Sequence, residues 1–325
     1  MDPLVSVIIV NYNGKNFLEK CLDSLKLINY DNFEILVVDN NSSDGSIDLI
    51  NKKFSNVILV ELEKNYGFAE ANNMSSKKAK GEYLLFLNND TIVTPDFIKE
   101  LITTIQSDKK IAICQSLLLK PSGDVDSSGD FVDTFGRAYS SREITHKIKP
   151  ILSARGASML IEKNIFFELD GFDSKFFATF EDVDLGWRAW LYGYKVVLSP
   201  KSLVYHYGSA TINDVRPLIQ FHGVKNTLIL RLTNFETFYS IKSILSLFTI
   251  SFFKRFFKMS LTVEPEEGPP FPPFKIIFNG HVWILKNLGY VLRKKQTINS
   301  KRKLSTRSLI DLGLITKSDF RFKTK

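Results

Sequence analysis

The fold is predicted from one pattern, which first appears in Val5-Ser6-Val7-Ile8-Ile9-Val10-Asn11-Tyr12-Asn13-Gly14. The first six of these residues form an apolar run of strand length, and the polar residues after them are typical of a turn. Phe17, Leu18, Leu22 and Leu25 then recur at helical spacing. The sequence therefore predicts a strand, a turn and an amphipathic helix in that order.

Further strands of this kind are expected at 33–38, 57–60 and 83–87, with a helix at about 47–53. Buried parallel strands that alternate with helices indicate an open α/β sheet, and such sheets bind ligands at the carboxyl ends of their strands. Polar residues stand at each of these ends. We therefore expect one cleft that includes Asp39, Asn65, Gly67 and Asp90.

A second feature is the acidic tract Glu181-Asp182-Val183-Asp184, which follows an aromatic loop and begins a helical pattern. Asp184 and Arg188 are one turn apart and can pair. Asp182 falls in the first turn or just before it, where backbone N–H groups and the helix dipole favour an ionised carboxylate. Taken alone, the tract is more typical of a capped, salt-bridged surface helix.

Together these motifs resemble the inverting family 2 glycosyltransferases of GT-A fold, and within them the rhamnosyltransferase-like branch. The motifs that carry the resemblance are 7–13, 38–46, 65–69 with Asn72-Asn73, 88–90 and 181–184. It implies an α/β fold with a Rossmann-like open mixed sheet flanked by helices. It also implies transfer of a sugar, with inversion, from a nucleotide-sugar donor to a hydroxyl of a glycan or lipid-linked acceptor. The branch suggests dTDP-rhamnose as the donor.

The resemblance assigns roles to single residues. Asp182 would be the catalytic base that removes the proton of the acceptor hydroxyl, and Glu181 would contact the acceptor. Asp90 and His206 would bind Mg²⁺ or Mn²⁺, which neutralises charge on the diphosphate. The acidic triplet of the family reads Asn88-Asn89-Asp90 here, so an amide replaces the first carboxylate and makes metal dependence less secure.

The donor-binding residues implied by the resemblance are Asn11, Tyr12, Asp39, Asn41, Asn65, Gly67, Asn73, Asn88, Asn89, Asp90 and Arg155. Two of the assignments have plain alternatives. His206 lies between two tyrosines, and a lone histidine in this setting is more often a packed, hydrogen-bonded residue than a metal ligand. Arg155 could be a surface arginine. The segment from Asp124 to Pro150 is expected to form a mobile part of the cleft.

The net charge of +8 is unevenly distributed. Residues 1–239 hold 26 basic and 30 acidic residues, and residues 240–325 hold 17 and 5, so the two parts carry −4 and +12. We expect a GT-A catalytic domain at 1–239, with a nucleotide-sugar half at about 1–120 and an acceptor half at about 121–239. A basic, amphipathic, helical extension would follow at 240–325.

The extension suggests attachment to an anionic membrane surface. The apolar run 244–253 is too short to cross a bilayer, and Lys254-Arg255-Phe256-Phe257-Lys258 after it suits an interfacial helix. A second amphipathic stretch, 274–292, ends in Arg293-Lys294-Lys295. The alternative is that these helices pack on the catalytic domain with a solvated basic face. Nucleic-acid binding is not expected, because no known module accompanies the charge.

The remaining composition is that of an ordinary globular protein, with 44% hydrophobic and 24% charged residues. The two cysteines have no metal-binding spacing, and Met1-Asp2-Pro3 leads directly into the first strand. We therefore expect a cytoplasmic protein, peripheral on the inner face of the cell membrane. Two other functions stay open: a nucleotidyltransferase, and a non-catalytic nucleotide-sugar-binding protein of the same fold. Nothing in the sequence predicts the oligomeric state.

Overall fold

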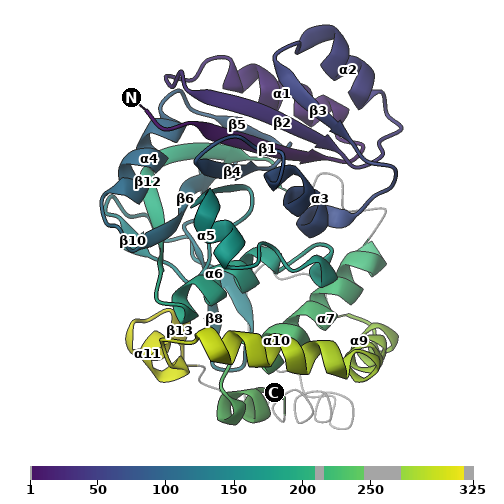
Figure 1. The fold of residues 1–325 in the computed structure, drawn as a ribbon, viewed down its shortest axis with the longest axis vertical. Coiled ribbons are helices and arrows are strands. Elements are labelled where there is room, and N and C mark those ends of the chain that lie inside the picture. Colours follow the sequence, from purple (N-terminus) through teal and green to yellow (C-terminus); the bar gives the residue numbers. More distant parts are fainter. Residues whose placement is uncertain (1, 209–215, 245–271, 318–325) are drawn as a thin grey trace.

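The computed structural model describes residues 2–208, 216–244 and 272–317, and its centre is a mixed β-sheet (Figure 1). The strands in spatial order are β10 (Lys149–Pro150), β12 (Lys195–His206), β6 (Ile111–Leu119), β11 (Ser158–Glu162), β4 (Tyr83–Leu87), β1 (Val5–Asn11), β2 (Phe33–Asp39) and β3 (Val57–Glu61). Strands β1 to β4 run parallel, whereas β11 is antiparallel to both β4 and β6. The predicted open mixed sheet of Rossmann-like order is confirmed.

Helices cover both faces of this sheet. The helices of the first 240 residues include α1 (Lys15–Leu25), α2 (Ser46–Lys53), α3 (Gly67–Ser76), α4 (Phe97–Gln106), α5 (Lys163–Glu168), α6 (Glu181–Leu191) and α7 (Arg216–Thr233). Alternation along β1 shows the two layers, since Val7 and Ile9 pack with the helices α1, α2 and α4 while Ile8 packs with α3, α6 and α7. Both layers are apolar because parallel strands are buried on both sides.

Further short strands, a 3₁₀ turn and a small second sheet complete the fold. The short strands are β5 (Thr91–Val93), which pairs with β12, and β7 (Val125–Ser127), which pairs with β6, and the turn lies at Ser174–Phe176. A small second sheet has the order β13 (Ile315–Thr316), β8 (Asp130–Asp133) and β9 (Ala138–Ser140). The segment expected to be a mobile part of the cleft thus contains β7, β8, β9 and β10.

The described part of the C-terminal extension packs on α6 and α7. It includes α9 (Phe274–Lys286), α10 (Leu288–Lys301), α11 (Thr306–Asp311) and β13. Its helices lie at the end of the molecule opposite α1 and α2 (Figure 1). None of the helices in the described ranges is long and apolar enough to cross a bilayer. The basic-aromatic run 254–258 and nearly all of the apolar run 244–253 lie outside the described residues.

Candidate active site

The carboxyl ends of β1, β2 and β4 meet at one edge of the sheet, as predicted. Nδ2 of Asn11 donates to Oδ1 of Asp39 (3.1 Å), and Nδ2 of Asn89 donates to Oδ1 of Asn11 (2.8 Å). Asn11 and Asp39 have no exposed surface, so they form the floor of this edge. Tyr12 and Asn41, which follow them in the chain, are exposed. Among these residues, Tyr12 and Asn41 are the ones a donor can reach directly.

Next to this floor, His206 lies between two carboxylates. Nε2 of His206 is 3.4 Å from Oδ1 of Asp90 and 3.5 Å from Nδ2 of Asn88. On the other side of the ring, Nδ1 lies 2.9 Å from Oδ2 of Asp126. The long strand β12 carries His206 to this point, where the residue pairs with Thr91 of β5, next to Asp90. His206 is therefore buried beside Asp90, with a partner on each side of its ring.

The two carboxylates change the protonation of this histidine. Burial alone would lower the pKa of His206, but hydrogen bonds to Asp126 and Asp90 raise it to about 9. Burial opposes ionisation of Asp126 as well, yet the hydrogen bond with His206 and the charge of Arg155 keep its pKa below the usual value. Without a bound cation, the ring of His206 is therefore protonated and lies between two carboxylates.

Arg155 is a third member of this cluster. Its Nη1 lies 3.2 Å from Oδ2 of Asp126, and its Nη2 lies 3.2 Å from Oδ1 of Asp130 and contacts Ser140. Burial disfavours the charged guanidinium, but Asp130 and Asp126 more than compensate and raise the pKa of Arg155. The guanidinium therefore holds two acidic residues of the acceptor half in place. It is neither an isolated surface arginine nor free to give all its donors to a phosphate.

Asp182 lies at the beginning of α6, as the sequence predicted. Its Oδ2 accepts a hydrogen bond from the backbone N–H of Gly156 (3.0 Å), and its Oδ1 accepts one from its neighbour Val183 (2.8 Å). Burial and the charge of Asp130 raise the pKa of Asp182 to about 6, against the opposing effect of the N–H groups and Arg155. A carboxylate with this pKa is ionised at neutral pH and is still basic enough to take a proton.

Its neighbour Glu181 is not placed to touch an acceptor. The side chain is only 6% exposed, and its Oε2 is buried without a hydrogen-bond partner among the described residues. Burial, followed by the charge of Asp182, raises the pKa of Glu181 well above its usual value. Glu181 is therefore a buried carboxyl next to Asp182 whose ionised form is disfavoured. Asp184 is structural as expected, since its Oδ2 accepts from Nε of Arg188 at 2.7 Å.

The loop before α6 has an unusual backbone. Phe177, Thr179 and Phe180 all have positive φ, between 65° and 69°, a conformation that costs energy for side chains of this size. The carbonyl of Phe177 accepts from the N–H of Phe68 at the beginning of α3 (2.7 Å). From α7, Asn226 donates through Nδ2 to carbonyls of the same loop, those of Phe176, Ala178 and Thr179. Two helices thus hold the strained loop that leads to Asp182.

Three residues expected to bind the donor have other tasks. Both ends of the Asn73 amide are used by the backbone of Phe172, at 2.7 and 3.0 Å. Gly67 has a φ of 78°, and a Cβ there would lie 2.4 Å from the carbonyl oxygen of Phe177, so glycine is needed for this close contact. Oδ1 of Asn65 accepts from the N–H of Gly67 (2.8 Å) and shapes the start of α3. These contacts hold the backbone at Phe172, the strained loop and the start of α3, and donor binding by the three residues stays a prediction.

Sequence reasoning missed three residues that the structure brings into the site. They are Asp126, Asp130 and Asn226. The two aspartates lie in a segment that no motif marks, and pairings with distant strands hold it there: β7 pairs with β6, and Asp130 pairs with Ser153. Asn226 lies far along the chain on α7. Its neighbours Lys225 and Thr227 are polar too, so no local pattern marks it.

Comparisons with known proteins agree with this fold. Residues 6–166 match the model of Glycosyl transferase family 2. The chain is 30% identical over 228 residues to O-antigen biosynthesis protein RfbC of Myxococcus xanthus, which covers 64% of this chain but only 18% of that protein. It is 26% identical over 308 residues to the uncharacterized glycosyltransferase RT0329 of Rickettsia typhi, covering 90% and 92% of the two chains.

Among solved structures, GalNAc-T7 with UDP, GalNAc and Mn²⁺ superposes with a TM-score of 0.59 at 18% identity, covering 89% of this chain and 57% of that one. This identity supports the fold alone. The family match adds the sequence evidence, because residues 6–166 include β1, β2, β4 and the 88–90 triplet. The chain belongs to glycosyl transferase family 2, and its fold is of the GT-A type.

Proposed function

We propose that this protein transfers a sugar from a nucleotide-sugar donor to an acceptor hydroxyl with inversion, and that Asp182 is the catalytic base. In this reaction the acceptor oxygen forms a bond to the anomeric carbon while the bond from that carbon to the diphosphate breaks. The acceptor proton passes to the Asp182 carboxylate, and the nucleoside diphosphate leaves. The observation that carries the proposal is the position of Asp182, partly buried, at the start of α6 with a pKa raised to about 6.

The hydrogen bonds at Asp182 support this role. Each carboxylate oxygen accepts one backbone N–H, which fixes the orientation of the group and leaves further lone pairs for a hydroxyl. Burial disfavours the charged form of the adjacent Glu181, and so disfavours a second negative charge that would repel the acceptor oxygen as it gains charge. Arg155 lies close enough to Asp182 to lower its pKa, and so limits how far burial can raise it.

The residues around His206 fit a divalent cation that is shared with the donor. No group of three His, Cys, Asp or Glu side chains in the described part of the chain is arranged to hold a metal ion. Asp90 and, once Nε2 has lost its proton, His206 can supply two ligands, and Mg²⁺ or Mn²⁺ commonly completes its coordination with substrate phosphates and water. When bound, the cation would stabilise the negative charge that develops on the leaving diphosphate. Asp126 would hold Nδ1 and direct Nε2 toward Asp90.

The donor and acceptor are proposed from the resemblance and from the relatives. RfbC is named for O-antigen biosynthesis, which favours a glycan or lipid-linked acceptor of the cell envelope. For the donor we keep dTDP-rhamnose as the first choice. Tyr12 and Asn41 are the exposed residues at the floor of the site that can contact the nucleoside.

Isothermal calorimetry tests the donor half of this proposal. The full chain is titrated with UDP, dTDP and GDP, and with their sugars, each with and without Mn²⁺. We expect one nucleotide class to bind, and to bind only weakly without the cation, because the protein itself supplies few ligands. Asp90→Asn should remove the effect of Mn²⁺, whereas Asp96→Asn, outside the site, should not. Binding of no nucleotide under either condition would overturn the proposal, and binding without subsequent transfer would favour the non-catalytic alternative.

A further inference from the structure

The C-terminal helices present an apolar surface that no described element covers. On α9, Phe278 and Leu285 lie two turns apart on one side of the helix, and Leu288 and Leu292 lie one turn apart at the start of α10. These four side chains are between 47% and 72% exposed. We call them, together with Lys275, Lys286 and Arg293, the α9–α10 outer face. Large exposed apolar side chains that gather on successive helices mark a binding surface more often than scattered ones do.

Basic residues border this apolar stripe, and acidic residues are absent from it. Residues 268–310 contain nine lysines and arginines and no aspartate or glutamate. Several of these basic residues turn inward: Lys294 reaches Asp173, Lys295 reaches the carbonyl of Leu232, and Arg302 reaches that of Asn234.

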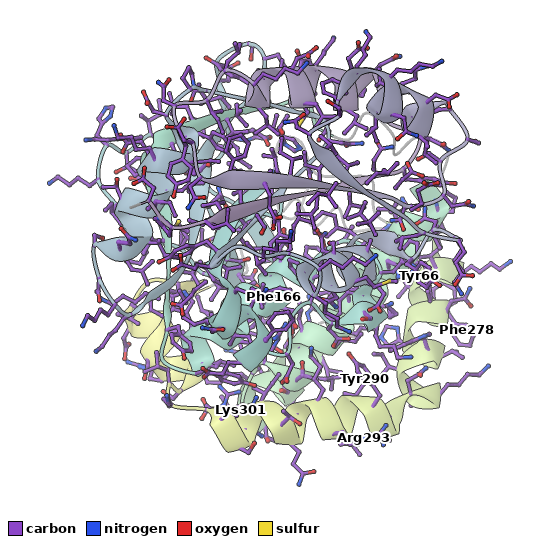
Figure 2. All side chains as sticks on the ribbon, turned by 45° about the horizontal axis from the view of Figure 1, so that its top comes forward. Tyr66, Phe166, Phe278, Tyr290, Arg293 and Lys301 are labelled. Atoms are coloured by element: carbon purple, nitrogen blue, oxygen red, sulfur yellow. The ribbon has the colours of Figure 1, made fainter. Side chains whose placement is uncertain are left out.

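Lys275, Lys286 and Arg293 are instead exposed. Figure 2 shows Phe278 and Arg293 on the outer sides of their helices, whereas Tyr290 points toward the body. The outer face therefore combines phenylalanine and leucine with cations.

We propose that the α9–α10 outer face docks the protein on the surface of an anionic lipid bilayer. Helices with this composition lie in the interface, with aromatic and aliphatic residues among the acyl chains and Lys or Arg at the headgroups. A second copy of the chain fits less well, because a two-fold contact would place the same cations opposite each other. The inference stands on this surface alone. If the proposed reaction is also correct, docking would hold the active site near a lipid-linked acceptor.

The test is co-sedimentation of the full chain with vesicles of phosphatidylcholine alone or with one third phosphatidylglycerol. We expect binding to the anionic vesicles that weakens with salt. The triple variant Lys275→Glu, Lys286→Glu, Arg293→Glu should lose on the order of 100-fold in affinity, since each basic residue near such a surface contributes about five-fold. The variant Phe278→Ser, Leu285→Ser, Leu292→Ser should also bind weakly, because it lacks the side chains that enter the bilayer.

Matched controls change the same residue types elsewhere on the surface. They are Lys52→Glu, Lys78→Glu, Lys109→Glu for charge and Leu27→Ser, Ile144→Ser for the apolar side chains, all of which are exposed. The controls should bind vesicles as the wild type does. Equal binding of the outer-face variants and the controls, or equal binding of the wild type to neutral and anionic vesicles, would overturn the proposal. The proposal would also be overturned if the wild type formed a dimer that did not bind vesicles and the apolar variant were a monomer.

Discussion

At the scale of single residues, the environment of Asp182 determines how activity should depend on pH. Because burial raises the pKa of this carboxyl to about 6, the base is ionised above that pH and protonated below it. We expect kcat/KM to fall as the pH is lowered through about 6. Well below that pH, the decrease should approach about tenfold for each pH unit. Initial rates from pH 5 to 8 measure this limb. A value of kcat/KM that stays constant down to pH 5 would contradict the assignment.

The same pKa has a consequence for stability. The folded-state value lies above the ordinary 3.8, so the folded protein resists ionisation and loses stability as the pH rises from about 4 to 6. Replacing Asp182 by Asn removes this cost. The variant should therefore be more stable than the wild type at pH 7, and the difference should shrink toward pH 4. Residues of active sites commonly lower the stability of a protein in this way.

Asp126 is expected to act through His206. In Asp126→Asn the residue keeps its shape but loses the charge that holds Nδ1 of His206. We predict a 10- to 100-fold loss in Mn²⁺-dependent nucleotide affinity, which is about the size of effect that outer partners of metal ligands have. Calorimetry with Mn²⁺ measures it, and the exposed Asp124→Asn serves as the control. Unchanged affinity in Asp126→Asn would show that the hydrogen bond at 2.9 Å does not position the histidine.

The sequence could predict residues that belong to a motif or stand at a strand end. Asp182, Asp90 and His206 were found in this way, and the structure places Asp90 beside His206. Residue type alone did not distinguish Asn73, whose amide serves a loop, from Asn89, whose amide faces the floor of the site. Which way an amide points depends on tertiary packing, and that information is not in a local pattern.

At the scale of elements, strands were predicted better than the loops that carry the chemistry. Strand β4 has the predicted ends, and β1, β2 and β3 are each one residue longer than expected, because apolar runs of strand length are a local signal. The strained loop before α6 was not predicted. Its positive φ values at Phe177, Thr179 and Phe180 depend on contacts from α3 and α7, which are distant in sequence.

The strained loop gives a prediction for Asn226. Asn226→Ala removes three hydrogen bonds to loop carbonyls, of 2.7 to 3.0 Å. The Phe176 carbonyl keeps the N–H of Ala178, whereas the carbonyls of Ala178 and Thr179 lose this donor. We expect a loss of about 1–3 kcal/mol in the free energy of unfolding. We also expect a lower kcat, because the loop orients the start of α6. Urea denaturation measures the first effect and steady-state kinetics the second. The exposed Asn51→Ala should change neither, and an unaffected Asn226→Ala would mean that α3 alone holds the loop.

At the scale of the whole molecule, one lysine joins the extension to the helix that carries the base. Nζ of Lys294 on α10 lies 2.6 Å from Asp173 and 2.9 Å from Asp184, which is buried on α6. Lys294→Met should cost about 1–3 kcal/mol in the free energy of unfolding, since Asp173 loses its cation while Asp184 keeps Arg188. Thermal and urea unfolding measure this loss, with the exposed Lys286→Met as the control. Equal stability of the two variants would contradict the coupling.

Charge distribution predicted where the extension begins to differ from the rest of the chain, but not how it packs. Part of its positive charge turns inward, as at Lys294, and β13 pairs with β8 of the acceptor half. Those contacts depend on side chains of the acceptor half that a basic, amphipathic pattern does not reveal. The boundary of the catalytic domain at 239 thus stays a prediction. Removing residues 240–325 would also remove Lys294, a partner of Asp184.

The central claim is that Asp182 takes the acceptor proton, and transfer by Asp182→Asn tests it most directly. Sugar transfer is measured with the nucleotide sugar that calorimetry identifies, in the wild type, in Asp182→Asn and in the exposed control Asp170→Asn. We predict that Asp182→Asn binds the donor within a few-fold of the wild type and loses about 100- to 10,000-fold in kcat, while the control is unchanged. Transfer by Asp182→Asn at the wild-type rate would contradict the account.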